Sequence, residues 1–230
     1  PLILIYKQPN LSTTILVSVL FCVLMFVGGL SWKIIGGVLA VAVPSVLIFL
    51  SIVMQEGQTL IKDYQRNRIM AFFDPATYAD TEAYQQLNCV IVLGLGLVWG
   101  RGRRKTDIAA VKNGNFPPES QTDFIFAIIG EELGFIGSAV VILLLILIAM
   151  RCVSIARVAK DTAGMVIAAG IGALIGIQGF MNIAVATMMM PNTGLPLPFV
   201  SYGLSSLVSM YIGIGFVLNV GLQRKNLYNL

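Results

Sequence analysis

The residues best able to do chemistry are three carboxylates, Asp123, Glu131 and Glu132, at one end of a strongly apolar stretch. The residues that follow, Leu133–Met150, carry no charge, which predicts a membrane-spanning helix over 124–150. A carboxylate at the middle of such a span costs about 2.5–3.5 kcal/mol on insertion scales. We therefore expect this helix to face a polar cavity, and we expect function in that cavity.

The spacing separates the three carboxylates from one another. Glu131 lies about 12 Å along the helix axis from Asp123 and about 80° around it, too far for the two groups to share a proton. Glu131 and Glu132 point about 100° apart, so they are expected to be buried supporting groups. Asp123 stands at the start of the helix, where an aspartate is also a good N-cap. From the residues alone, capping and catalysis both stay open for Asp123.

The composition defines the class of protein that must position these groups. The chain has 230 residues, of which 57% are hydrophobic and 11% are charged, against about 25% charged in soluble domains. We expect an all-α, polytopic helical membrane protein with about five full spans and a long loop at 55–122. The expected spans are 11–31, 34–54, 124–150, 164–190 and 197–221.

Several kinds of chemistry are excluded or unsupported. The chain has no histidine, which excludes Ser-His-Asp, Cys-His and His-ligated metal sites. Its three cysteines, Cys22, Cys89 and Cys152, give no disulfide framework and no CxxC pair. No metal site is expected, and nothing indicates a nucleic-acid partner. The apolar start, Pro1–Ile5, resembles the end of another helix, so we expect the chain to begin partway through a longer protein.

The basic residues of the short connections predict the orientation. All of them fall on one side of the predicted bundle, opposed by a single acid, Asp161; they are Lys33, Arg151, Arg157, Lys160, Arg224 and Lys225. The positive-inside rule places that side and the C-terminus in the cytoplasm. The loop 55–122 is then extracytoplasmic.

The long loop contains an apolar piece between basic clusters. Residues 88–100 are too few for a full span, and we expect a re-entrant or interfacial helix there. The flanking basic residues suit an anionic head group, although adhesion to anionic membrane lipids or plain solvation explains them equally well. The glycines at 94, 96, 100 and 102 do not form a dinucleotide fingerprint and favour close helix packing or a bend.

Two further patterns lie near the end of the chain. Ala168, Gly172 and Gly176 repeat every four residues, which lets another helix approach closely. Residues 192–203 contain Pro196 and Pro198, which prevent a regular helix and leave backbone groups free. Such backbone survives at membrane depth where protein or a water-filled cavity satisfies it. A kinked start of the following helix and a functional site are equally compatible with this composition.

Four motifs in order resemble the SEDS family of bacterial cell-wall proteins, which includes RodA, FtsW and SpoVE. They are KQPN at 7–10, KDYQRNRI with FFDP at 62–75, TDFIFAIIGEELGFIG at 122–137 and NTGLPLPFVSYG at 192–203. The resemblance implies the C-terminal portion of a ten-span protein of the bacterial cytoplasmic membrane. It also implies a peptidoglycan glycosyltransferase that polymerises lipid II and works with a class B penicillin-binding transpeptidase.

The resemblance also assigns residues. Asp123 matches the family's essential acid and would be the general base in an inverting transfer, while Glu131 and Glu132 would support it. Residues expected to contact substrate come from the same motifs and from the loop: Arg101, Arg103, Arg104, Thr122, Pro196, Pro198, Ser201, Tyr202 and Gly203. No cofactor is evident, and the question of a divalent cation at the diphosphate stays open.

Three departures from the family pattern keep a second class of function open. Asn10 replaces an aspartate and Ser12 a glycine, Leu204 replaces a glycine after the SYG motif, and the usual GSGG reads Gly94-Leu-Gly-Leu97. These departures are compatible with a divergent member. The alternatives are a flippase for a lipid-linked precursor or a non-catalytic scaffold for the transpeptidase. The KDYQRNRI stretch leans slightly towards the rod-shape branch over division or sporulation.

Overall fold

The fold is built from helices. The computed structural model describes residues 11–53, 63–81, 83–102 and 122–223, and every regular element in these ranges is an α-helix. The helices are α2 (Leu11–Val27), α3 (Trp32–Val53), α4 (Asp63–Phe73), α5 (Tyr84–Leu95), α6 (Ile125–Arg157), α7 (Thr162–Ala186) and α8 (Leu204–Leu222). The expected all-α, polytopic architecture is confirmed. Predictions that involve residues 1–10, 54–62, 82, 103–121 and 224–230 lie outside the described ranges.

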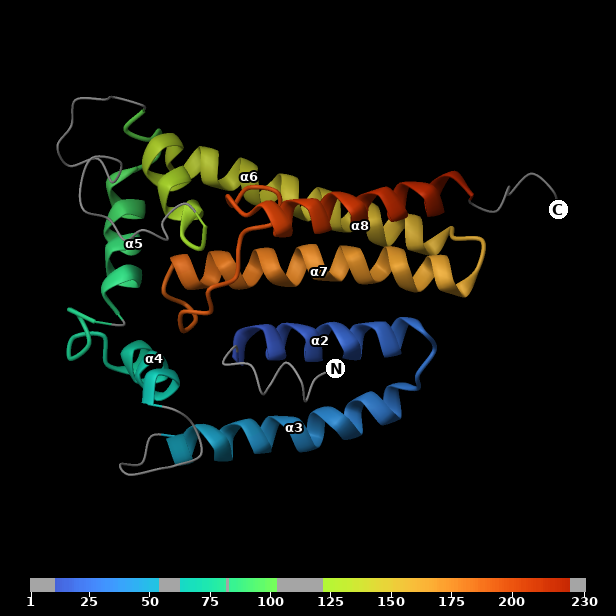
Figure 1. The fold of residues 1–230 in the computed structure, drawn as a ribbon, viewed down its shortest axis with the longest axis horizontal. Helices are drawn as coiled ribbons and strands as arrows, with labels where there is room; N and C mark the ends of the chain where they lie inside the picture. The colour runs from blue at the N-terminus through green and yellow to red at the C-terminus, as the bar shows by residue number, and fades with distance from the viewer. Residues whose placement is uncertain (1–10, 54–62, 82, 103–121, 224–230) are drawn as a thin grey trace.

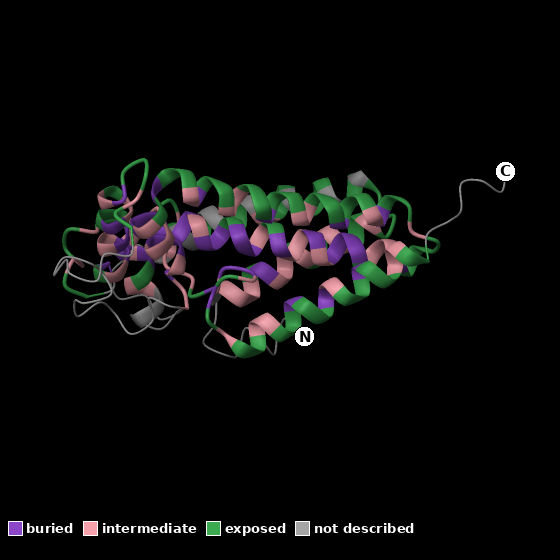
Figure 2. Cartoon of the chain, turned by 90° about the horizontal axis from the view of Figure 1, so that it is seen from above, coloured by how far each residue is buried: buried purple, intermediate pink, exposed green. Residues whose placement is uncertain are grey.

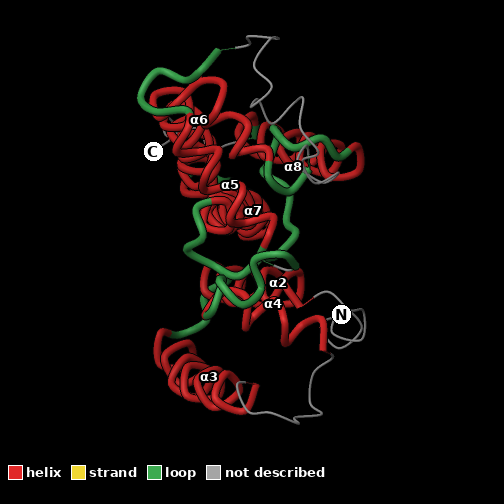
Figure 3. Tube along the Cα trace, turned by 90° about the vertical axis from the view of Figure 1, so that its left-hand side faces the viewer, coloured by secondary structure: helices red, strands yellow, loops and turns green. Residues whose placement is uncertain are grey.

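The long helices run alongside one another, and the short ones cross one end of them (Figure 1). Helices α6, α7 and α8 form one group, α2 packs on the other side of α7, and α3 lies beyond α2 (Figure 3). At the end crossed by α4 and α5, helices α2, α6 and α8 begin and α3 and α7 end (Figure 1). We call this the loop end and the opposite one the turn end. Lys33, Arg151, Arg157 and Lys160 all lie towards the turn end.

Helix α7 is the centre of the bundle. In its most apolar window 50% of the residues are buried, against 17% in α6 and in α8. The buried residues run along the middle of the bundle and gather at the loop end (Figure 2). A Cβ added to Gly172 would lie 2.9 Å from the Cβ of Cys152 on α6. The prediction that the small-residue stripe admits a neighbouring helix is therefore confirmed.

Three of the described helices, α6, α7 and α8, are long and apolar enough to cross a membrane. Helix α2 has 17 residues and α3 has 22, and the count of five spans stays a prediction. The ends of the helices differ from the bounds of the predicted spans. Helix α6 continues to Arg157, while α7 ends at Ala186 and α8 begins at Leu204, seven residues later than expected. The proline-containing segment between α7 and α8 accounts for the late start, because it cannot form a helix.

Helix α6 is broken at Gly134, whose φ of 68° and ψ of −165° are not helical. The part after the break, 135–157, is about 33 Å long at 1.5 Å per residue, enough to cross the hydrocarbon alone. Glu131 and Glu132 lie before the break, in the short first part. The expectation of one continuous helix with two carboxylates inside the span was therefore wrong, because a glycine in the left-handed region ends the first part.

The break is closed by the segment that follows α5. The amides of Phe135 and Ile136 donate to the carbonyl oxygens of Leu97 and Val98, at 2.9 and 3.2 Å. In return, two amides of the same segment, Arg101 N and Gly102 N, donate to the carbonyl oxygens of Glu131 and Glu132, at 2.8 and 3.1 Å. The backbone groups that the break frees are thus satisfied by protein. We call residues 97–102 the clamp.

The helix predicted over 88–100 has different bounds in the structure, because its last residues belong to the clamp. Helix α5 begins earlier, at Tyr84, and ends at Leu95. Leu97 then takes a φ of 48°, which is uncommon for a residue with a side chain and turns the chain towards α6.

The glycines of this region permit a very close approach of two backbones. A Cβ on Gly96 would meet the carbonyl oxygen of Gly130, and a Cβ on Gly100 would meet that of Glu132, both inside any allowed contact distance. A Cβ on Gly134 would likewise overlap the amide nitrogen of Gly100. The structural interpretation of the glycine series is therefore confirmed.

Candidate functional site

Asp123 lies at the loop end, in the turn that leads into α6, and its side chain is half-buried. The N-cap of α6 is the next residue, Phe124, and it makes no side-chain capping bond. Asp123 therefore directly precedes the N-cap residue, and both interpretations of its carboxylate stay predictions. Asp123 Oδ2 lies 3.4 Å from the position that a Cβ on Gly194 would occupy. The carboxylate thus packs against the proline-containing segment between α7 and α8, which we call the proline loop (187–203).

Buried amides of α7 hold the proline loop against Asp123. Asn182 donates from Nδ2 to the carbonyl oxygens of both Asp123 and Leu195, each at 2.7 Å. One turn earlier, Gln178 Nε2 donates to the carbonyl oxygen of Pro196 at 2.8 Å. Both side chains are buried. A single side chain therefore fixes the distance between the backbone of Asp123 and that of the loop.

Ser201 makes a second connection between the two motifs. Its Oγ accepts from the amide of Leu197 at 2.6 Å and donates to the carbonyl oxygen of Thr122 at 2.5 Å. Ser201 is 2% exposed, so in this structure its hydroxyl positions the backbone. The first two residues of the 122–137 motif and residues 195–201 of the 192–203 motif thus form one connected unit.

The proline loop is strained as well as pinned. Met188 and Phe199 take φ values of 58° and 63°, and Gly194 takes 64°. For Met188 and Phe199, which are not glycines, such a conformation costs about 1–3 kcal/mol per residue, and strain of this kind clusters at functional sites. Two buried polar atoms of this unit, Asn182 Oδ1 and Thr193 Oγ1, have no hydrogen-bond partner among the described residues. Unsatisfied buried groups of this kind are suited to bind water or substrate.

Helix α5 is tied to the same unit. Gln86 is buried, and its Nε2 donates to the carbonyl oxygens of Val185 and Met190, at 3.0 and 2.9 Å. The neighbouring Cys89 is buried too, and this burial raises the pKa of its thiol to about 12. At neutral pH the thiol stays protonated and is no nucleophile.

The other predicted site residues occupy different settings. Pro198 is buried, Pro196 is half-buried and Tyr202 is 78% exposed at the loop end, while Gly203 is the N-cap of α8. Arg101 is exposed on the clamp. Arg103 and Arg104 lie outside the described residues.

Glu131 is buried and Glu132 half-buried, next to the clamp. The structure thus brings Asp123, Thr122 and the proline loop together. The two glutamates stand apart from that unit, beside the break in α6. Their supporting role stays a prediction.

Gln178 and Asn182 were not identified from the sequence, although a signal was present. They are two amides four residues apart within residues 162–223, a stretch that contains no charged residue. A buried amide in an apolar helix is costly unless it is hydrogen-bonded. The (i, i+4) spacing puts both on one face of the helix, so they predict a polar contact with another segment.

The site offers one carboxylate in a polar, backbone-lined setting. In the described part of the chain no three His, Cys, Asp or Glu residues are grouped as metal ligands. A half-buried carboxylate held beside unsatisfied polar groups can accept a proton from a bound hydroxyl. General-base chemistry on a substrate that enters from the loop end is what this geometry can support.

The fold and the site define a polytopic helical membrane protein with a carboxylate at the loop end of its bundle. Sequence comparison gives the particular family. The family of FtsW, RodA and SpoVE, described as cell cycle proteins, matches residues 1–226, and the chain belongs to this family. The suspected SEDS membership is thereby confirmed.

Individual relatives agree with this assignment. The chain is 37% identical over 227 residues to the peptidoglycan glycosyltransferase MrdB of Escherichia coli K12, covering 99% of the chain and 59% of MrdB. It is 35% identical to a probable peptidoglycan glycosyltransferase FtsW of Nitrosomonas europaea, covering 97% of the chain and 55% of that protein. The chain therefore spans less than three fifths of the length of these relatives.

A solved structure shares the fold. It is a chain of a peptidoglycan synthase complex in a study of the coordination of polymerization and crosslinking. The TM-score is 0.69 at 28% identity, and the match covers 97% of this chain and 58% of the solved one.

Proposed function

We propose that this chain carries the catalytic carboxylate of a peptidoglycan glycosyltransferase, with Asp123 as the general base. The substrate is the polyprenyl-diphosphate-linked disaccharide lipid II, and the product is a glycan strand. Family membership and the names of the relatives support the activity. The observation that carries the role of Asp123 is its contact with Gly194 in a loop whose backbone is fixed by Asn182 and Ser201.

The proposed step is an inverting displacement at the anomeric carbon of the donor. Asp123 takes the proton of the acceptor's sugar hydroxyl while that oxygen forms a bond to the anomeric carbon. The bond from that carbon to the diphosphate breaks on the opposite face, and its electron pair leaves with the polyprenyl diphosphate. Proton transfer to a positioned base contributes typically 10²–10⁴-fold.

The other residues that we propose to contact the substrate are chosen by their position near Asp123 or on or just after the clamp. The proline loop, through Pro196, Pro198, Tyr202 and Gly203, forms the wall beside Asp123, and Thr122 and Ser201 hold that wall to α6. The arginines at 101, 103 and 104 receive the diphosphate, because guanidinium groups bind phosphate oxygens bidentately.

The proposed setting follows from charge and from the relatives. The turn end, which carries Lys33, Arg151 and Arg157, faces the cytoplasm of a bacterium. The loop end faces the extracytoplasmic side of the inner membrane. The partner is a class B penicillin-binding transpeptidase. A peptidoglycan synthase complex among the structural neighbours supports this choice.

The test is polymerisation of lipid II by the intact protein with its partner. Asp123→Asn removes the base but keeps the size of the side chain, and we expect glycan synthesis to fall at least about 10²-fold. Expression and partner binding should be unchanged. Asp161→Asn is a matched control, because this acid caps α7 at the turn end through the amide of Gly164, and it should leave the activity intact.

Other outcomes point to other functions. Full activity of Asp123→Asn would remove the assignment of the base. Lipid translocation without polymerisation would favour a flippase, and partner stimulation without either activity would favour a scaffold. Addition of a chelator to the same assay decides whether a divalent cation assists the departing diphosphate.

A further inference from the structure

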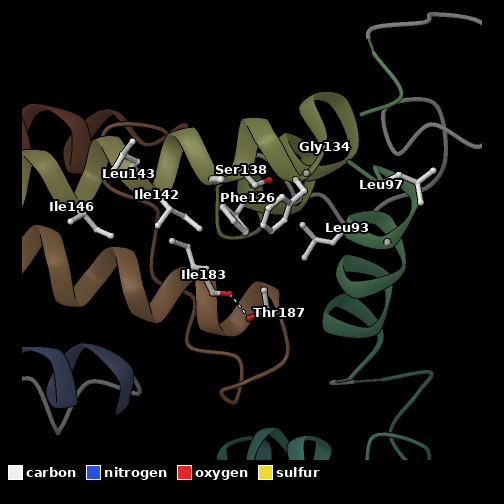
Figure 4. A pocket seen from close by; sticks show the side chains of 14 residues that line it. Leu93, Leu97, Phe126, Gly134, Ser138, Ile142, Leu143, Ile146, Ile183 and Thr187 are labelled. Atoms are coloured by element: carbon white, nitrogen blue, oxygen red, sulfur yellow. Dashed lines mark hydrogen bonds between the residues drawn. The ribbon is translucent and has the colours of Figure 1, made fainter. Parts of the chain in front are cut away.

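Helix α5 crosses the loop end and packs against both α6 and α7. Its buried residues, Gln86, Cys89 and Val92, follow one another at intervals of three, so they lie on one side of the helix. Leu93 lies on the same side, and Figure 4 shows it pointing from α5 towards Phe126 of α6. This side of α5 is therefore the one that meets the other two helices.

Gln86 holds the first part of the proline loop. Its Nε2 donates to two carbonyl oxygens, that of Val185 at 3.0 Å and that of Met190 at 2.9 Å. Between these two acceptors lies Met188, whose φ of 58° turns the chain out of α7. Gln86 is 1% exposed. Its amide is thus shielded from water and joins the chain before this turn to the chain after it.

The next part of the same loop is held by Asn182, which donates to the carbonyl oxygen of Leu195 at 2.7 Å. Only residues 191–194 separate the two held positions, 190 and 195. Gly194, which packs against the carboxylate of Asp123, is one of them. The place of Gly194 beside the carboxylate therefore depends on Gln86 as well as on Asn182.

The same side of α5 also holds the residue that follows Asp123. Phe124 is 1% exposed and belongs to a buried cluster with Cys89 and Val92 of α5 and Val185 of α7. Helix α5 thus contacts the chain on both sides of the site. It holds Phe124 by apolar packing, and it holds the proline loop by the hydrogen bonds of Gln86. One helix therefore sets the spacing between the carboxylate and the loop.

We propose that Gln86 is a positioning residue for the general base, an inference that rests on the proposed role of Asp123. By holding Met190 against α5, Gln86 keeps Gly194 and the rest of the proline loop beside the carboxylate. The acceptor hydroxyl then meets Asp123 in the geometry that proton transfer needs, and no proton passes through Gln86 itself. A misplacement of about 1 Å can cost about 10²-fold in rate.

The test is a double-mutant cycle in lipid II polymerisation by the intact protein with its partner, with each rate given per folded protein. Gln86→Met keeps the length of the side chain and removes both donors, and we expect kcat to fall about tenfold. In the Asp123→Asn background the same change should alter the residual rate by less than about twofold, because the base through which Gln86 acts is already absent. A defect of stability alone would lower both rates by the same factor.

Gln223→Met is the matched control. The substitution is the same, and Gln223 is an exposed side chain at the turn end that donates to Asn219 Oδ1 at the end of α8, at 3.1 Å. It should leave kcat unchanged.

A second variant keeps the test decisive if Gln86→Met does not fold. Gln86→Asn keeps the amide but is one methylene shorter, so it can reach only one of the two carbonyl oxygens. We expect kcat to fall about threefold. This effect, too, should disappear in the Asp123→Asn background.

Three results would overturn the inference. The first is an unchanged kcat in a folded Gln86→Met or Gln86→Asn protein. The second is a fall by the same factor with and without Asp123, which would make Gln86 a residue of stability alone. The third is full activity of Asp123→Asn, which would remove the proposed base and this inference with it. The rate of that single variant thus separates a failure of the proposed function from a failure at Gln86.

Discussion

Two interruptions of regular helix lie at the loop end, and they are stabilised in different ways. The proline loop is held by side chains, through the amides of Gln178 and Asn182 and the hydroxyl of Ser201. The break at Gly134 is held by the backbone of the clamp, at distances that only glycine permits. Side-chain contacts can shift with a bound substrate, whereas two interlocked backbones cannot. The carboxylate lies in the region that side chains hold, and the clamp lies apart from it, beside Glu131 and Glu132.

The largest effect is expected at Gly96, the residue just before the clamp. Gly96→Ala would place a methyl group inside the contact distance of the Gly130 carbonyl oxygen, which is backbone and cannot yield. We expect a loss of about 3–5 kcal/mol in stability, measured as a fall in the apparent Tm of the protein in detergent. Gly94→Ala is the matched control, because a Cβ there would meet nothing within 4 Å. An equal Tm for the two variants would show that the backbones are not in contact.

The next effect is expected in the proline loop. Asn182→Ala leaves the carbonyl oxygens of Asp123 and Leu195 without their donor. We expect the free energy of unfolding to fall by about 2–4 kcal/mol, since each buried unsatisfied group costs about 1–3 kcal/mol. Glycan synthesis should fall even below the melting temperature, because the loop moves away from Asp123. Unchanged polymerisation would mean that the loop does not position the base.

Ser201→Ala should have a smaller effect of the same kind. It removes one hydroxyl that joins Leu197 to Thr122. We expect the free energy of unfolding to fall by about 1–3 kcal/mol. Ser209→Ala on α8 is the control, because that hydroxyl is exposed and bonds only within its own helix. If the two variants melt at the same temperature, the connection between the two motifs contributes nothing.

The smallest effect is expected at Leu97, and it has the opposite sign. Leu97 combines a φ of 48° with a side chain that is 77% exposed. Leu97→Gly relieves the left-handed strain and loses little burial, so stability should rise by up to about 1 kcal/mol. Val98→Gly, beside it and without a positive φ, should lower the Tm. A fall for Leu97→Gly would show that its side chain is held by a contact.

Much of this organisation could be predicted from particular residues. The charge-free stretches predicted the helices, Pro196 and Pro198 predicted the interruption before α8, and Gly172 predicted the close packing of α6 and α7. These features depend on local sterics and on hydrophobicity, which act over a few residues. The break in α6 was missed because Gly134 follows two glutamates in a pattern that is otherwise helical. Its cause, the clamp, comes from more than 30 residues earlier in the chain.

The sequence by itself determined the membrane class, the family and Asp123 as the acid to test, because composition and motif residues carry that information directly. Only the tertiary structure decided what surrounds Asp123. It joined 122–123 to 195–201 through Asn182 and Ser201, and it placed Glu131 and Glu132 beside the clamp, away from the proposed base. The physical reason is that each of these contacts depends on where distant backbone carbonyls come to lie, which no local pattern of side chains specifies.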